Sequence, residues 1–376
     1  MPGQPFQGRF SGSVVLARLR NAAAPDTGDF MTIQASDLAD FGWSPFFHSQ
    51  VQSQDFSRSL AVRVTAVHRG RLHLQGPGLD LVTPSFAQHA TIGDWLLLEA
   101  DTQRPQRVLD RRSLFSRIAP GTGRELQLIA ANVDTVFVVS SCNQDFSVAR
   151  LERYLALARE AQVTPVIVLT KSDLATAPEE FVRAAAKARA GVHVEAVNAL
   201  EADEVGRLGA WCGRGQTVAL LGSSGVGKST LVNTLAHATL ATQPARADDD
   251  RGRHTTTRRE LFRLPAGGWL LDTPGMRELQ LADVGVGLAD VFAEIDAAAA
   301  RCRFTDCRHE SEPGCAVQQH IAGGLIDPDR LRRWRKLAAE SARNQQTLAD
   351  RRAAERRFGK FAKRVMASKR ARRDPD

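Results

Sequence analysis

Apolar and polar residues follow two different rhythms along this chain. From Leu60 to about Asp110, short apolar runs are broken by turn residues, among them Gly70, Gly78 and Gly93. Strands are therefore expected at Ala61–Val67, Arg71–Gln75, Leu79–Val82 and Trp95–Ala100. Five or so short strands in about fifty residues predict a small β-barrel. The size fits an oligonucleotide-binding (OB) barrel, although periodicity alone does not separate it from other small barrels.

From about residue 130 to residue 285, continuous apolar runs alternate with segments of helical periodicity. The runs predict buried strands at Val133–Ser140, Pro165–Leu169, Val192–Val197 and Thr217–Leu221, and a pair at Glu260–Leu264 and Trp269–Leu271. Helices are expected at Ala149–Ala161, Pro178–Ala190, Lys228–Ala236 and near Leu288–Ile295. Continuous apolar strands separated by helices are typical of a mostly parallel sheet that is covered on both faces.

Composition and charge narrow the class of protein. The 376 residues are 43% hydrophobic and 24% charged, which is normal for a globular chain of two or three domains. No apolar run approaches the roughly 20 residues that span a bilayer, and no export signal is recognisable, so we expect a cytoplasmic protein without membrane contact. The formal net charge is +8, and the segment from Arg351 onward alone holds 11 basic against 3 acidic residues. We expect that segment to contact a polyanion such as nucleic acid; a solvated helix with a frayed tail is the alternative.

The N-terminal region has two parts. Residues 1 to about 30 are rich in Gly, Ala, Pro and Gln and are expected to be mobile. Residues 30–57 carry an aromatic cluster formed by Phe30, Phe41, Trp43, Phe46, Phe47 and Phe56. Packing of this cluster against a neighbouring domain is favoured over stacking on nucleobases, which is the alternative.

Residues 222–229 match the phosphate-binding loop pattern, in which a Gly and four further residues precede Gly-Lys-Ser. The pattern follows one expected strand and opens an expected helix, which is the context that the motif requires. Backbone N–H groups of such a loop surround phosphate oxygens, and the helix N-terminus adds its positive end. We expect Lys228 to reach the β- and γ-phosphates and the Ser229 hydroxyl to bind Mg²⁺. The predicted nucleotide contacts here are Gly222, Ser223, Ser224, Gly225, Val226, Gly227, Lys228, Ser229 and Thr230.

Two further motifs indicate which nucleotide binds. Thr170-Lys171-Ser172-Asp173 follows one buried strand, and Asp272-Thr-Pro-Gly275 follows another. A carboxylate at Asp173 can accept the N1–H and the exocyclic amine of guanine, a donor pair that adenine lacks on that edge. Asp272 is placed to hold Mg²⁺ through water, and the Gly275 N–H to sense the γ-phosphate. Because α/β sheets bind ligands at the carboxyl ends of their strands, the motifs together predict GTP, with an ATP-using P-loop enzyme as the alternative.

The motifs occur in a rotated order. The base motif and a candidate base-contacting loop, Val197-Asn198-Ala199, precede the phosphate loop, the candidate switch threonines 255–257 and the Asp-Thr-Pro-Gly motif. Asn198 is the predicted nucleotide contact of that loop. The cyclic order is that of ordinary GTPases, so the domain is predicted to be circularly permuted, which is tolerated because domain termini often lie close together.

With these motifs, the sequence resembles the ribosome-small-subunit-dependent GTPase A family, also called RsgA or YjeQ. The likeness also rests on Gln127-Leu-Ile-Ala-Ala-Asn-Val-Asp134, on Gly252-Arg-His-Thr-Thr-Thr257 and on a Cys/His cluster after Arg301, and it covers about residues 60–334. It implies an OB barrel, a permuted GTPase domain and a zinc-bearing helical domain. It also implies a role in late maturation of the small ribosomal subunit, which stimulates the family's GTP hydrolysis.

Several positions bear on specificity and catalysis. Thr170 stands where the usual motif has Asn, so we expect somewhat weaker guanine binding, with Asp173 retaining the specificity. Met276 stands where many GTPases carry the glutamine that orients water, which predicts slow intrinsic hydrolysis. His254 is the candidate catalytic replacement that orients or deprotonates water; a solvated loop residue is the alternative. Among the switch threonines, Thr257 is favoured as the Mg²⁺ ligand.

Four candidate metal ligands lie within fourteen residues of each other: Cys302, Cys307, His309 and Cys315. Three thiolates and one imidazole suit a closed tetrahedral Zn²⁺ site. Four protein ligands leave no position for a reacting water, so the site is predicted to be structural; buried cysteines with an incidental histidine are the alternative. Five cysteines in a chain without an export signal argue against disulfides, and we expect Cys142 and Cys212 to be packing residues.

The sequence thus predicts a GTP hydrolase that binds GTP and GDP with Mg²⁺ and carries one structural Zn²⁺. The resemblance implies that it acts as a late-stage assembly factor on the small (30S) ribosomal subunit and its rRNA, and we expect a monomer. The alternative is a GTP-binding, RNA-binding module with negligible catalysis. The expected layout is a flexible N-terminal extension over 1–59, an OB barrel over 60–112, the permuted GTPase domain over 113–285, a zinc-binding helical domain over 286–350 and a basic arm over 351–376.

Overall fold

A computed structural model describes residues 15–20, 30–52, 58–68, 70–85, 90–118, 126–236, 259–272 and 284–342, with only the backbone at 15–20, 30–35, 259 and 272. The chain forms two compact units. The first holds most of the sequence up to Leu279, and the second combines Val148–Glu160 and Ala188–Ala190 with the segment from Gln280 onward. Among the described residues, no helix is both long enough and apolar enough to cross a membrane.

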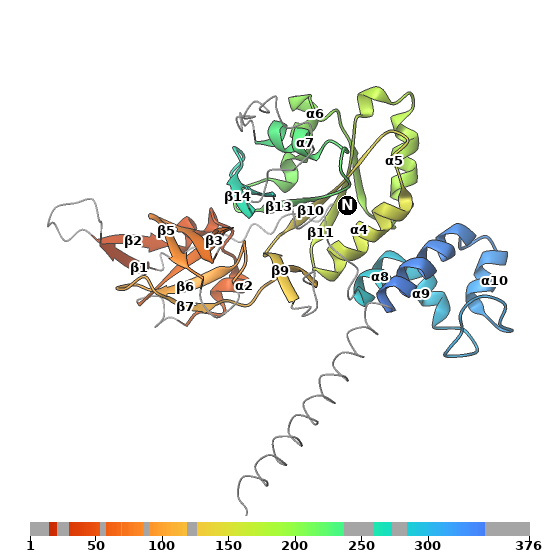
Figure 1. The fold of residues 1–376 in the computed structure, drawn as a ribbon, viewed down its shortest axis with the longest axis horizontal. Coiled ribbons are helices and arrows are strands. Elements are labelled where there is room, and N and C mark those ends of the chain that lie inside the picture. Colours follow the sequence, from red (N-terminus) through yellow and green to blue (C-terminus); the bar gives the residue numbers. More distant parts are fainter. Residues whose placement is uncertain are drawn as a thin grey trace, which may run out of the picture. The chain divides into compact units, whose positions relative to one another are not determined.

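Antiparallel strands build the N-terminal part of the first unit (Figure 1). They are β3 (Ser59–His68), β4 (Arg71–Gly76), β5 (Leu79–Pro84), β6 (Trp95–Glu99) and β7 (Pro105–Val108). Strand β3 pairs with both β4 and β6, while β5 extends β4 and β7 extends β6. The antiparallel strands predicted from the short apolar runs are confirmed. Two hairpins accompany these strands: β1 (Val15–Arg20) with β2 (Phe30–Gln34), and β8 (Leu114–Ile118) with β9 (Leu126–Ala131).

The aromatic cluster before residue 60 packs into the core of these strands. Helices α1 (Ala35–Ala39) and α2 (Pro45–His48) carry buried side chains into the same cluster as Trp95, and the rings of Trp43 and Trp95 meet edge to face at 4.8 Å. Packing, and not base stacking, is therefore the role of Trp43 and Phe47. Phe56 and the side chain of Phe30 lie outside the described residues.

Six strands form the central sheet, in the order β12-β11-β10-β13-β15-β14. All neighbours are parallel except the pair β14–β15. Strands β10, β11 and β13 are almost entirely buried apolar runs, as a covered parallel sheet requires. The strands are β10 (Thr135–Ser141), β11 (Thr164–Thr170), β12 (His193–Ala196), β13 (Thr217–Leu221), β14 (Arg259–Arg263) and β15 (Trp269–Asp272).

Helices of the first unit cover one face of this sheet. Side chains from α6 (Ala202–Gly206) and α7 (Lys228–Leu235) share a core with Phe137, Val168 and Leu220 of the strands. Helix α5 (Pro178–Ala186) and the short 3₁₀ turns Ser172–Leu174 and Arg207–Trp211 complete the described helical segments of this unit.

Helices form the second unit around a buried ionic centre. Glu152 is fully buried and accepts hydrogen bonds from Arg330 at 3.0 Å and from Arg333 at 2.8 Å. The helix predicted near Leu288–Ile295 is two helices, because the chain leaves helical geometry at Phe292. The elements are α4 (Val148–Glu160), α8 (Gly285–Val291), α9 (Ala293–Ala299), α10 (Ala316–Ala322) and a helix over 328–342.

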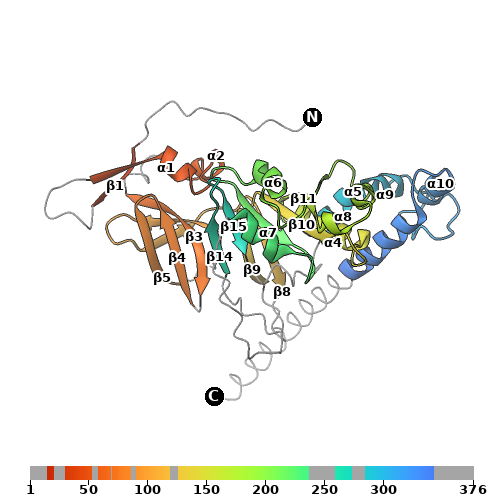
Figure 2. The same cartoon turned by 90° about the horizontal axis from the view of Figure 1, so that it is seen from above.

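The barrel strands and the central sheet are joined into one continuous sheet, since β14 pairs with β3 (Figure 2). Beside this seam Arg63 of β3 is 1% exposed and donates to the Phe41 carbonyl and to the Thr217 hydroxyl, each at 2.7 Å. Burial lowers the pKa of Arg63 to about 10, so the guanidinium is still charged at neutral pH. A buried cation therefore fixes the start of β13 to the barrel.

Gly93 brings the barrel close to strand β9. Its φ is +88°, and a Cβ on it would lie 2.0 Å from the carbonyl oxygen of Ala131. No side chain fits between the two backbone segments at this distance. Both the positive φ and the close contact therefore require glycine at this position.

We expect Gly93→Ala to lower the free energy of unfolding by about 3 kcal/mol or more, because it adds a backbone clash to the cost of a positive φ. Gly70→Ala is the matched control: its φ is +79° but nothing lies within 4 Å of its Cβ position. That control is expected to cost only about 1 kcal/mol. Urea unfolding of the two variants measures the difference, and equal losses would contradict the close approach.

Candidate functional site

The phosphate loop connects β13 to α7. Gly222 lies against the neighbouring strand, since a Cβ there would be 2.4 Å from the carbonyl oxygen of Val139. Gly227 adopts a left-handed conformation with φ +87° and caps α7. The ammonium of Lys228 is folded back over the loop and donates to the carbonyls of Gly222, at 2.9 Å, and Ser223. The loop therefore has the strand–turn–helix form that anion binding by this motif requires.

The base motif follows β11 and touches the phosphate loop directly. The Thr170 side chain is fully buried, and its hydroxyl donates to the Val226 carbonyl at 2.6 Å. The Lys171 ammonium donates to the Gly225 carbonyl at 3.0 Å. Asp173 lies one turn further and is exposed, so its carboxylate is open to a ligand. The two contacts join residues that are 56 and 54 positions apart in sequence, so two distant segments form one surface.

The Thr170 hydroxyl has two carbonyl groups of the protein within reach. It lies within reach of the Val226 and Ser140 carbonyls, and those are its contacts in the structure. Threonine at this position therefore fastens the base motif to the phosphate loop. The expected weakening of guanine binding by Thr170 stays a prediction.

The third segment, after β12, is held by the helix that follows the phosphate loop. Thr234 of α7 donates its hydroxyl to the Ala199 carbonyl at 2.7 Å. The Asn198 side chain accepts from the Leu200 N–H, and Glu204 accepts from the Asn198 N–H at 2.8 Å. These side-chain contacts stabilise the predicted base-contacting loop.

Other predicted site residues are only partly placed. Strand β15 runs parallel to β13, so its last residue, Asp272, reaches the same edge of the sheet as the phosphate loop. The side chain of Asp272 lies outside the described residues, as do His254, Thr257, Gly275 and the basic segment 351–376. Their predicted roles stay predictions.

The contacts that join these segments leave little trace in the sequence. Thr234 gives no signal, because a hydroxyl on a helix is common. Arg63 does give a signal, because it is the lone charged residue in the apolar run from Leu60 to Val64. The structure shows that this position is buried. Its partner Thr217 is 154 residues away in sequence.

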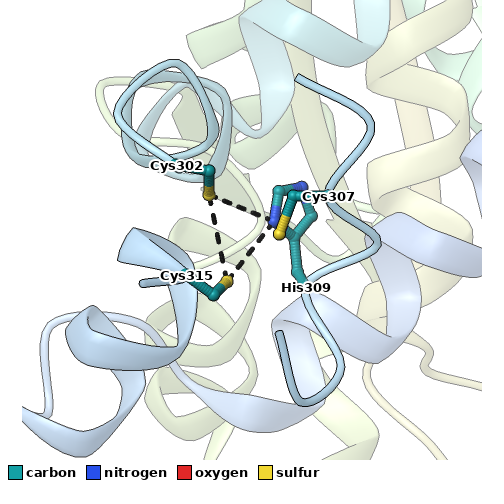
Figure 3. Close-up of side chains that lie close together, drawn as sticks. All are labelled: Cys302, Cys307, His309 and Cys315. Carbon is teal, nitrogen blue, oxygen red and sulfur yellow. Dashed lines mark hydrogen bonds between the residues drawn. The ribbon is translucent and has the colours of Figure 1, made fainter. Parts of the chain in front are cut away.

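The four candidate metal ligands converge in the second unit (Figure 3). Their ligand atoms all lie within 4.8 Å of one another. The sulfurs of Cys302 and Cys315 are 3.9 Å apart, and each is about the same distance from His309 Nδ1, at 3.5 and 3.6 Å. A tetrahedron with metal–sulfur bonds of about 2.3 Å has edges of about 3.8 Å. The spacing of the ligand atoms therefore fits tetrahedral coordination of one metal ion by these four residues, which is the predicted geometry.

Hydrogen bonds around the cluster orient its ligands. Arg335 and Gln318 both donate to the carbonyl of His309. Burial lowers the pKa of His309, which favours the neutral imidazole that binds metals. Glu312 accepts the backbone N–H groups of residues 308, 310 and 311, and these bonds lower its pKa to about 2. These contacts within the protein thus hold the loop that carries the candidate ligands.

The remaining cysteines have a different environment. Cys142 and Cys212 are buried, and burial raises the pKa of their thiols to about 11 and about 12. Such thiols are packing residues, as the sequence predicted.

The model of the RsgA GTPase family matches residues 108–282, which contain the permuted motifs. A small ribosomal subunit biogenesis GTPase RsgA 2 of Vibrio parahaemolyticus is 47% identical over 347 residues, covering 92% of this chain and 97% of that protein. The chain belongs to the RsgA GTPase family. A second relative, the small ribosomal subunit biogenesis GTPase RsgA of Mesorhizobium japonicum, is 48% identical over 84% of this chain and 92% of its own length.

Solved structures share the RsgA fold. The crystal structure of YjeQ from Thermotoga maritima superposes with a TM-score of 0.57 at 22% identity, covering 76% of this chain and 99% of that one. YloQ, described as a circularly permuted GTPase, gives a TM-score of 0.54 at 22% identity, covering 76% and 95%. The predicted family and fold class are therefore confirmed.

In this RsgA-family chain, Thr170→Val is expected to weaken GTP and GDP binding about tenfold, because a buried carbonyl loses its donor. Thr170→Ser keeps the hydroxyl and is expected to restore binding. Equilibrium titration with a fluorescent guanine nucleotide measures both. Wild-type affinity in Thr170→Val would show that this bond does not position the site.

Proposed function

We propose that this chain is a GTP-hydrolysing biogenesis factor of the small ribosomal subunit, as its relatives are named. The observation that carries the proposal is the bond from Thr170 to Val226, which supports a single site for guanine recognition and phosphate binding. Lys228 would bind the β- and γ-phosphates, Ser229 and Thr257 the Mg²⁺, and Asp272 its water. Asp173 would bind guanine, beside Asn198.

In the same proposal, the γ-phosphate is sensed by Gly275, and His254 orients or deprotonates the attacking water. The protein acts in the cytoplasm as a monomer. Its barrel contacts rRNA, and its zinc domain and the basic segment 351–376 contact rRNA or ribosomal protein. The basic segment supplies the electrostatic part of binding. Mg²⁺ accompanies the nucleotide, and Zn²⁺ occupies the Cys₃His cluster.

Turnover of GTP with and without purified small subunits tests the proposed function. We expect slow hydrolysis alone and an increase of roughly tenfold or more with subunits, since the water-orienting group is completed only on the ribosome. His254→Ala is expected to remove about 10²-fold of the stimulated rate and to leave GTP affinity unchanged. If small subunits do not raise the rate of hydrolysis, the result would favour a GTP-binding module with negligible catalysis. If ATP competes for the site as strongly as GTP does, the result would favour an ATP-using enzyme.

Removal of a metal ligand tests the proposed zinc site. Cys315→Ser is expected to reduce bound zinc from about one ion per chain to a trace, because a thiolate of the closed set is lost. Amides of Ala316–Ala322, the helix that Cys315 caps, should then exchange faster. Cys212→Ser, in the first unit, is the control and should keep its zinc. Full zinc content in Cys315→Ser, by elemental analysis, would contradict the assignment.

A further inference from the structure

A groove of about 470 Å³ lies in the first unit, away from the phosphate loop. Residues of the β4–β5 hairpin and of the β14–β15 hairpin line it, together with Phe41. Figure 2 shows these strands in neighbouring parts of the continuous sheet. The lining residues that bear on ligand binding are Phe41, Gln75, Asp80, Arg263 and Trp269.

A planar cation forms one side of the groove. The Arg263 guanidinium carbon lies 5.0 Å from the centre of the Trp269 ring and 5.9 Å from that of Phe41. The Asp40 carbonyl accepts from Arg263 at 2.8 Å and fixes its orientation. The Arg263 side chain is nonetheless 41% exposed. A guanidinium that is packed on a ring and still reached by solvent can stack a second planar group.

A carboxylate also lines the groove. Asp80 is 62% exposed and accepts hydrogen bonds from Gln75 Nε2 at 2.9 Å and from His73. The His73 bond is the main cause that lowers the pKa of Asp80, so the group is ionised at neutral pH. A carboxylate has about four acceptor positions, of which these bonds use two. The groove therefore offers a stacking plane and unused acceptors.

We propose that this groove binds one unpaired guanine nucleotide of an RNA strand, with the base stacked on Arg263 and its N1–H and N2 donors directed to Asp80. The inference rests on the proposed function, because the RNA would be that of the ribosomal subunit. Guanine alone among the four bases presents two adjacent donors on one edge. The wall strands β4 and β5 are the second and third strands of the barrel, which is where OB barrels bind oligonucleotides.

A basic peptide of a ribosomal protein is a weaker candidate for the groove. It would satisfy Asp80 but would leave the exposed guanidinium plane without a stacking partner. Since Asp80 and Arg263 face the same groove, a neutral aromatic ring with donors at its edge matches both.

Anisotropy titrations of the full chain, saturated with GDP so that the nucleotide site is filled, test the proposal. The probes are fluorescein-labelled uridine heptamers with a central G, A, C or U. The central-G heptamer is expected to bind about tenfold more tightly than the others, as a bidentate base contact allows. Asp80→Asn should abolish this preference, while Asp101→Asn, exposed on the barrel outside the groove, should retain it.

Arg263→Lys keeps the positive charge but removes the planar guanidinium on which the base would stack. All four heptamers should therefore bind about fivefold more weakly. Arg104→Lys, exposed on the barrel outside the groove, is its control and should leave affinity unchanged. Thermal unfolding checks that each variant is folded, and the exposure of Asp80 makes its substitution mild.

Equal binding of the four heptamers by the wild type, or a retained preference in Asp80→Asn, would overturn the proposal. So would competition by free GMP as strong as by the central-G heptamer, which would assign the groove to a mononucleotide, or displacement of the heptamers by a basic peptide. The subunit-stimulated GTPase of the same preparations separates the two claims. If stimulation is present without a guanine preference, the groove proposal fails and the proposed function stands. If stimulation is absent, the proposed function fails, whatever the heptamers show.

Discussion

Parallel pairing on both edges of β10 is the constraint on which the nucleotide site depends. On one side β10 pairs with β11, which ends at the base motif, and on the other with β13, which ends at the phosphate loop. Because parallel strands end at the same edge, motifs in rotated sequence order meet in space. The covalent order of the segments then matters little, which is why a circular permutation preserves the site.

Side-chain hydrogen bonds turn this proximity into one rigid surface. Thr170 and Lys171 bind carbonyls of the phosphate loop, and Thr234 binds the loop after β12. Each bond contributes about 1 kcal/mol, and together they couple the position of the base to that of the phosphates. At the far end of β13, Arg63 and Thr217 link the same strand to the barrel, so the groove and the nucleotide site belong to one continuous sheet.

Local patterns were predictable from sequence, whereas contacts between distant segments were not. The phosphate loop and the Cys₃His cluster have fixed spacings, and strand β13 begins and ends at the expected residues. The motif at Thr170 predicts guanine binding, but the Val226 carbonyl that the Thr170 hydroxyl contacts belongs to another segment, which a four-residue motif does not specify. Trp43 and Phe47 were expected to pack, and they do. The sequence nevertheless assigns them to an N-terminal extension, because their partner Trp95 lies far along the chain. The contact of Arg63 was not predictable for the same reason, because its partner Thr217 is 154 residues away in sequence.

Nucleotide preference after Asp173→Asn tests most directly whether the rotated segments form one guanine site. Asparagine presents an amide donor where the carboxylate accepted, which suits the acceptor that xanthine has in place of the exocyclic amine of guanine. The account predicts that GTP affinity falls about a hundredfold, and that XTP becomes the preferred nucleotide at the same phosphate loop. Unchanged GTP affinity in Asp173→Asn would contradict it.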